Sequence, residues 1–80
     1  MGEGGLTMKR FSMRYVSDDI VCGSNDHTYG CANSLNVAKQ YIAKCKASLK
    51  DRHPRNFRIY DHFADIDPVS GFVPIVYQED

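Results

Sequence analysis

Three cysteines and one histidine are the residues of this 80-residue chain best suited to hold a metal ion, namely Cys22, His27, Cys31 and Cys45. Thiolate and imidazole groups are the usual ligands of structural zinc, and such sites normally include two cysteines roughly two to four residues apart. This sequence has no such pair. Cys45 also falls on the apolar side of a predicted helix, where a buried thiol behaves as a small hydrophobic group. We therefore predict no metal site and no cofactor.

Cys31 and a group of acidic residues are the candidates for catalysis. Cys31 could approach the N-terminus of the predicted helix, an environment that activates thiols, but spacing identifies no base as its partner. Asp61, His62, Asp65 and Asp67 bring together groups that could transfer protons. Alternation places Asp61 and His62 on opposite faces of a strand, whereas Asp65 and Asp67 stand where turns favour aspartate. We interpret the group as structural and predict no catalytic residue and no enzyme.

One short string resembles a known family. Val21 to Tyr29 reads VCGSNDHTY, which is similar to the Cys-Gly-Ser-Asp-Gly-x-Thr-Tyr signature that precedes a disulfide-bonded helix in Kazal-type serine protease inhibitors. The resemblance implies a Kazal-like inhibitor fragment. That family has six cysteines, whereas here the next one, Cys31, comes two residues early and none precedes Cys22. Our first interpretation of residues 23–31 is a polar loop, with a strand continuing through Thr28-Tyr29 past a bulge as the alternative.

The clearest predicted element is an amphipathic helix. Apolar residues recur at spacings of three and four in one stripe: Leu35, Ala38, Ile42, Cys45 and Leu49. Asn33 is the predicted N-cap, with Ser34 as the alternative one residue later. His53-Pro54 ends the helix, because proline disfavours helical geometry in the residue before it.

Four strands flank this helix. Period-two alternation predicts strands over 7–16 and 56–66. Turn signals at 17–19 and 67–71 are each followed by a further predicted strand, over 20–22 and 72–77. Pro74 cannot donate to a sheet ladder, which puts the last strand at an edge. The sequence therefore predicts an α+β fold of the order ββαββ, with one amphipathic helix packed on one face of a four-stranded, mainly antiparallel sheet. Residues 1–6 are predicted to be a flexible lead and 7–80 a single small domain. The predicted inward residues are Phe11, Met13, Tyr15, Leu35, Ala38, Ile42, Cys45, Leu49, Phe57, Ile59, Val73, Ile75 and Tyr77.

The sheet face away from the helix carries the functional hypotheses. The last predicted strand is apolar on both sides, so Phe72, Pro74 and Val76 point outward and need a cover from the N-terminal segment, a second copy or another protein. This predicts partner binding at these three residues. The alternative is binding of single-stranded nucleic acid or phosphate, because a cationic and aromatic set shares the same face: Arg10, Arg14, Arg58, Tyr60 and His62.

Charge and composition narrow the class of protein. Ten basic and ten acidic residues give zero formal net charge, which argues against a dedicated polyanion binder and allows self-association. The longest apolar run, 72–77, is far shorter than the ~20 residues of a membrane span. The odd cysteine count and the lack of a visible secretion signal predict a cytoplasmic location. No reaction or biological process can be named from these residues. We expect a small accessory or interaction domain of bacterial or phage type that acts through protein contact, either with an unidentified protein or with itself as a homodimer.

Overall fold

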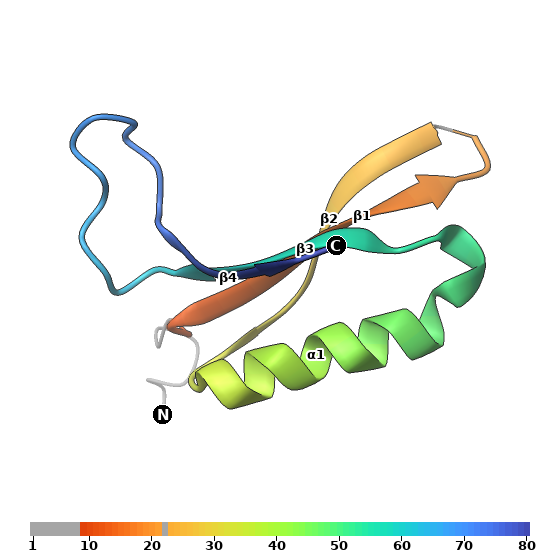
Figure 1. The fold of residues 1–80 in the computed structure, drawn as a ribbon, viewed down its shortest axis with the longest axis horizontal. Coiled ribbons are helices and arrows are strands. Elements are labelled where there is room, and N and C mark those ends of the chain that lie inside the picture. Colours follow the sequence, from red (N-terminus) through yellow and green to blue (C-terminus); the bar gives the residue numbers. More distant parts are fainter. Residues whose placement is uncertain (1–8, 22) are drawn as a thin grey trace, which may run out of the picture.

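The computed structural model describes residues 9–21 and 23–80, which form one sheet and one long helix (Figure 1). The elements in chain order are β1 (Phe11–Asp19), β2 (Gly23–Ala32), α1 (Leu35–Ser48), a short 3₁₀ helix η2 (Lys50–Arg52), β3 (Arg55–Asp61) and β4 (Ile75–Glu79). All three strand pairings are antiparallel and the sheet order is β2-β1-β3-β4. The α+β prediction of one helix on a four-stranded antiparallel sheet is confirmed, as is the edge position of the last strand. Within the described ranges, no helix has the length and apolar character needed to cross a membrane.

The core lies between α1 and the sheet face that α1 covers. Its buried apolar residues come from β1, β3, the end of β2 and one side of the helix: Phe11, Met13, Tyr15, Ala32, Ala38, Ile42, Cys45, Phe57 and Ile59. Leu35, Leu49 and Tyr77 are half-buried against this cluster. Most of the predicted inward set is therefore confirmed, because alternation along β1 and β3 and the helical stripe agree on the same side.

The inward prediction was wrong for Val73 and Ile75, which line the opposite face of the sheet. The predicted strand 72–77 is instead β4, which begins at Ile75. Its register against β3 shifts, with Ile59 opposite Tyr77 and Tyr60 opposite Ile75. The unmatched residue between these pairs reverses the alternation. Tyr77 therefore faces the core while Ile75 shares the open face with Tyr60.

The predicted polar loop over 23–31 was also wrong, because β2 runs through it as an edge strand. Pairing with β1 holds this polar sequence in extended form, with a bulge where Met13 faces Gly30 and Arg14 faces Thr28. Tyr29 is the additional residue at this bulge, and it packs against the core. A strand that passes a bulge at Thr28-Tyr29 was the alternative prediction for this segment. The predicted turn at 17–19 was wrong, because β1 continues through these residues. The predicted strand 20–22 was wrong at Ile20 and Val21, which form a turn, and Cys22 lies outside the described residues.

The helix boundaries follow the sequence with small changes. The N-cap is Ser34 rather than Asn33, and the Ser34 carbonyl accepts the first intrahelical bond from the Ala38 amide at 3.0 Å. After α1 and η2 the chain reverses at His53, whose φ of 52° is left-handed, ahead of Pro54. β3 ends at Asp61, earlier than the predicted 66. The predicted flexible lead over residues 1–6 lies outside the described residues.

Two projections rise from the sheet on the side away from α1 (Figure 1). One is the tip of the β1–β2 hairpin, where Ile20 and Val21 are almost fully exposed. The other is the long connection over residues 62–74 between β3 and β4. The helix closes one face of the sheet, whereas the other face lies open between these projections.

Candidate ligand-binding hollow on the open sheet face

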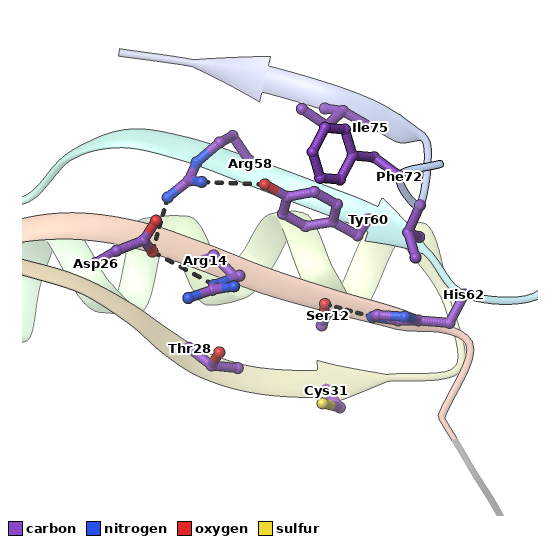
Figure 2. Close-up of a pocket in the computed structure, with 11 residues that line it drawn as sticks. Ser12, Arg14, Asp26, Thr28, Cys31, Arg58, Tyr60, His62, Phe72 and Ile75 are labelled. Atoms are coloured by element: carbon purple, nitrogen blue, oxygen red, sulfur yellow. Dashed lines mark hydrogen bonds and ion pairs between the residues drawn. The ribbon is translucent and has the colours of Figure 1, made fainter. Parts of the chain in front are cut away.

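A hollow of about 720 Å³ opens on the sheet face opposite α1 (Figure 2). It is formed by three strands, the 62–74 connection and the start of β4, and its lining is Ser12, Arg14, Asp26, Thr28, Cys31, Arg58, Tyr60, His62, Phe72, Val73 and Ile75. The polar side chains come from β1, β2 and β3, with His62 directly after β3. The aliphatic side chains come from the chain leading into β4. The hollow thus has a polar floor and an apolar wall.

Two arginines lie directly opposite each other on this floor. Arg14 of β1 is the cross-strand partner of Arg58 of β3. Like charges in such a pair destabilise a sheet, in contrast to opposite charges. The Asp26 side chain of β2 reaches both of them, and its Oδ1 is 2.9 Å from Arg58 Nη2 and 3.3 Å from Arg14 Nε (Figure 2). One carboxylate therefore bridges two guanidinium groups.

Arg58 is held rigidly in this arrangement. Its Nη2 donates to Asp26, its Nη1 to the Tyr60 hydroxyl at 3.0 Å, and its Nε to the Asn56 carbonyl at 3.0 Å. Only 12% of the side chain is exposed. The hydrogen bond to Asp26 raises the pKa of Arg58 above its usual value, so the group stays charged. Arg58 acts as a fixed structural cation, with each of its three nitrogen atoms already donating one hydrogen bond.

Arg14 is less completely satisfied. Its Nε is buried and is within ion-pair distance of Asp26, but it lacks a hydrogen-bond partner in the described part of the chain. The ion-pair distance without a hydrogen bond means that the Arg14 Nε–H is not aligned with the Asp26 oxygen. That oxygen already accepts a hydrogen bond from Arg58 Nη2. A buried donor without an acceptor carries a desolvation cost. The buried Nε is closed to a ligand, so the 41% of the Arg14 side chain that is exposed is what a ligand in the hollow can reach.

A serine and a histidine form a second polar contact in the hollow. Ser12 Oγ lies 2.7 Å from His62 Nε2 (Figure 2), and Ser12 is buried near the start of β1. A hydroxyl beside an imidazole can be a nucleophile and its base, provided that backbone N–H groups stabilise the resulting oxyanion. β1 is paired on both sides, so its N–H groups are committed to the sheet ladders. The pair is better suited to anchoring a ligand than to attacking one.

The apolar wall is unusually open to solvent. Phe72 is 73% exposed and Ile75 is 45% exposed. In Figure 2 the Phe72 ring lies beside Ile75 and above Tyr60, whose ring forms the boundary between wall and floor. The Arg58 guanidinium is 5.9 Å from the centre of that ring. A ligand entering here would meet aromatic and aliphatic surface next to guanidinium groups.

The structure brings together four of the five residues predicted for nucleic-acid binding: Arg14, Arg58, Tyr60 and His62. Arg10 is not among the lining residues. Its Nε and Nη2 each donate to a different carboxylate oxygen of Asp61 at 3.0 Å, and this contact engages it elsewhere.

Of the three residues predicted for partner binding, only Phe72 lines the hollow. Val76 is exposed at the irregular position of β4, and Pro74 is half-buried, with its carbonyl accepting from the Asp61 amide at 3.1 Å. Sequence reasoning missed Ser12, Asp26, Thr28, Cys31, Val73 and Ile75 as lining residues. Continued alternation of Asp26 and Thr28 with His27 and Tyr29 was the signal that could have identified two of the residues of β2. Cys31 faces the hollow only because of the bulge at Tyr29.

The candidate metal and disulfide residues are separated by the sheet. Cys31 lines the open face, whereas Cys45 is buried in the core on α1. His27 packs against Tyr15 with ring centres 5.5 Å apart. No group of three potential ligands gathers within residues 9–21 and 23–80, and Cys22 lies outside the described residues. Cys45 is a free thiol, so the disulfide-bonded helix implied by the Kazal resemblance is not seen at this residue.

Asp61 and Asp67, two of the acidic residues near the β3–β4 connection, have structural roles. Asp61 is buried on the core side while His62 lines the hollow, which confirms that they face opposite ways. Asp61 Oδ1 accepts from the Phe63 amide at 3.0 Å, and Asp67 Oδ1 accepts from the Val69 amide at 2.8 Å. Both contacts are local turns made by an aspartate side chain.

Comparison of the chain with protein-family models, with curated proteins and with solved structures finds no match. Its functional interpretation therefore depends on the geometry of the hollow.

Proposed function

We propose that this chain is a small binding domain whose open sheet face holds a segment of a partner protein. The observation that carries the proposal is the exposed apolar wall, Phe72 and Ile75, beside a hollow on the one sheet face that α1 leaves uncovered. Contiguous exposed apolar surface beside polar groups is typical of interaction sites. Aromatic residues and arginine, both present here, are enriched in protein interfaces.

The two projections beside the open face support a protein-sized partner. Exposed apolar side chains occur on both of them: Ile20 and Val21 on the hairpin, and Phe63, Ile66 and Val69 on the 62–74 connection. A small metabolite would contact only the floor and wall, whereas a protein segment lying across the face would also reach these side chains. Coverage of this surface would remove it from water, at about 25 cal/mol for each Å² of apolar area.

We further propose that the domain binds without catalysis and acts in the cytoplasm. The backbone N–H groups of β1 around Ser12 are committed to the two sheet ladders, so they are not free to stabilise an oxyanion at its hydroxyl. Cys31 and Cys45 are free thiols, and unpaired cysteines persist in reducing compartments.

Selection from a library of displayed random peptides tests the proposal. We expect enrichment of apolar sequences whose affinity for the purified domain falls at least tenfold in Ile75→Asp. Val37→Asp is the matched control, because Val37 is an exposed aliphatic residue on α1 at 37%, away from the hollow. Circular dichroism confirms that both variants fold. Failure to enrich any sequence, or equal binding by both variants, would contradict the proposal.

Sedimentation equilibrium asks whether the partner is a second copy of the chain. A dimer that Ile75→Asp converts to a monomer, while Val37→Asp leaves it intact, would identify self-association through this face. A monomer in all three proteins would assign the face to a different protein.

Single-stranded nucleic acid is a second candidate ligand, favoured by the gathering of Arg14, Arg58, Tyr60 and His62 in one hollow. Guanidinium groups hold phosphates and an exposed aromatic ring can stack on a base. Fluorescence anisotropy with short RNA and DNA should then show binding that weakens as salt is raised. Absence of binding at low salt, or binding unaffected in the Arg14→Ala, Arg58→Ala double variant, would remove this candidate.

A further inference from the structure

We infer that the hollow contains a carboxylate-binding subsite at Arg14, so that the partner segment presents an Asp or Glu side chain next to an apolar residue. This inference rests on the proposed function, because it specifies the chemistry of the segment that the open face would hold. It follows from three features of the hollow: its charge balance, the exposed end of the Arg14 guanidinium, and the apolar wall beside it.

The charge balance of the floor leaves one positive charge uncompensated. Arg14 and Arg58 contribute two positive charges, and Asp26, the carboxylate bridging them, contributes one negative charge. The remaining lining residues carry no acidic group. A directly opposed pair of like charges on two central strands is costly for a sheet. A second carboxylate would complete the neutralisation that Asp26 begins.

Arg14 is the arginine that can accept this second carboxylate. Arg58 already donates from Nε, Nη1 and Nη2 and is nearly buried. The Arg14 side chain is 41% exposed, and its contact with Asp26 is a longer ion pair of 3.3 Å through the buried Nε, which leaves the exposed end of its guanidinium facing the hollow. A guanidinium group presents its donors in a planar fork that fits a carboxylate through two parallel hydrogen bonds. The ligand would therefore engage Arg14 while Arg58 stays fixed by Tyr60 and Asp26.

The charge present favours a carboxylate over a phosphate. A carboxylate has one negative charge, which matches the single uncompensated positive charge. A phosphate monoester carries nearly two negative charges at neutral pH, and the second would face Asp26 at short range. The neighbouring side chains of Tyr60, Phe72 and Ile75 supply an apolar surface next to the charged group. The arrangement thus fits an anion attached to an aromatic or aliphatic group.

Nuclear magnetic resonance titration with three small probes tests the subsite directly. The probes are 3-phenylpropanoate, its neutral amide 3-phenylpropanamide, and phenyl phosphate, and the signals followed are the Nε–H groups of Arg14 and Arg58. We expect 3-phenylpropanoate to shift the Arg14 Nε–H signal at least threefold more than the amide does. Arg14→Gln should abolish saturable binding, whereas Arg52→Gln, the same change at an exposed arginine outside the hollow, should leave it unchanged.

Asp26→Asn gives an independent test, because it removes the carboxylate that competes for Arg14 while keeping the shape of the side chain. We expect this variant to bind 3-phenylpropanoate about fivefold more tightly, as removal of one exposed like-charge repulsion is worth up to about 1 kcal/mol. Weaker binding by a folded Asp26→Asn variant would overturn the assignment, since Asp26 would then be part of the ligand's support rather than its competitor.

The outcomes separate this inference from the proposed function. Equal shifts with 3-phenylpropanoate and the amide would overturn the carboxylate subsite while leaving an apolar peptide-binding hollow. Stronger binding of phenyl phosphate would overturn it in favour of the nucleic-acid candidate. Failure of all three probes to bind would overturn the subsite, and only the peptide selection would then decide the proposed function.

Discussion

At the scale of single residues, Asn56 shows how a local conformation sets the geometry of the hollow. Its φ is 55°, in the left-handed region, and it lies where β3 carries one more residue than β1 between the pairs Arg14–Arg58 and Val16–Arg55. Asparagine tolerates this conformation far better than a branched residue does. The bulge brings the Asn56 carbonyl to Arg58 Nε, which helps to hold that arginine in place.

Substitution of Asn56 tests this role. We expect Asn56→Val to lower the free energy of unfolding by about 1–2 kcal/mol, because a β-branched residue is strained at positive φ. Asn56→Gly should remain within about 0.5 kcal/mol of the original protein, since glycine adopts this conformation freely. Urea unfolding followed by circular dichroism measures both. Equal destabilisation by the two substitutions would indicate that the asparagine side chain matters more than the backbone conformation.

Asp61 gives a prediction about pH. The hydrogen bonds from Arg10 hold the pKa of Asp61 below its ordinary value of 3.8. A group with a lowered pKa in the folded state stabilises the fold above its unfolded-state pKa, and this contribution is lost as the pH falls through the folded-state pKa. We therefore expect Asp61→Asn to lower the thermal unfolding midpoint at pH 7.

The difference between the two proteins should shrink as the pH falls through the folded-state pKa of Asp61, which lies below 3.8, because the carboxyl then becomes protonated in the original protein. Thermal scans at pH 7, 4 and 2.5 measure this difference between the two proteins. Asp18 and Asp67 also have lowered pKa values, so Asp61→Asn should reduce the acid sensitivity of the fold without removing it. A difference between the two proteins that does not change with pH would rule out charge as the cause.

At the scale of elements, α1 is the main cover of the core and depends on its apolar stripe. Ile42 is 3% exposed between Ala38 and Cys45, which are fully buried. We expect Ile42→Val to cost about 1 kcal/mol of unfolding free energy, the usual effect of deleting one buried methylene. Ala43→Ser, one residue along on the exposed side of the helix, should stay within about 0.5 kcal/mol. Chemical unfolding curves distinguish these values, and equal costs would contradict the assigned orientation of α1.

The elements that the sequence predicted well are those whose periodicity is unbroken. The stripe from Leu35 to Leu49 predicts the helix, and the alternation of Phe57 and Ile59 predicts the core side of β3. The errors occur at irregular positions. A bulge in β2 and the shifted register of β4 reverse the inward or outward direction of side chains, and a one-residue slip has this effect on every residue beyond it.

The candidate site was only partly predictable for the same reason. Arg14, Arg58, Tyr60 and His62 lie on regular parts of β1 and β3 or directly after β3, so alternation placed them on one face. Asp26 lies in a segment that the sequence predicted as a loop, and Ile75 lies where the register of β4 shifts. Their part in the hollow depends on how these segments pair with β1 and β3. Tertiary pairing, rather than local preference, decided where these two residues face.

At the scale of the whole molecule, the fold is asymmetric. One sheet face is closed by α1, whereas the other carries an uncompensated charge, an apolar wall and two projections with exposed apolar tips. Because formal net charge is zero at pH 7, little long-range repulsion keeps two copies apart. Any attraction between exposed apolar groups should therefore be visible near neutral pH.

The final prediction concerns association between copies of the chain through the exposed apolar tips of the two projections. We expect the Ile20→Lys, Val69→Lys double variant to show less self-association at pH 7 than the original protein, measured by light scattering over a range of concentrations. Both residues are at least 93% exposed, so the free energy of unfolding should change by no more than about 0.5 kcal/mol for each substitution. The variant also has two additional positive charges, which alone would increase repulsion between copies.

A charge-matched control separates the two causes. Gln40→Lys, Ala43→Lys adds the same two charges on the exposed side of α1 and leaves both projections unchanged. If the apolar tips mediate contact, association should decrease more in the Ile20, Val69 variant than in this control. An equal decrease would mean that net charge alone governs association and would leave the projections without a part in binding. A larger decrease in the variant of the projections would extend the binding surface from the hollow to both of its flanks, the arrangement that a protein segment lying across the open face requires.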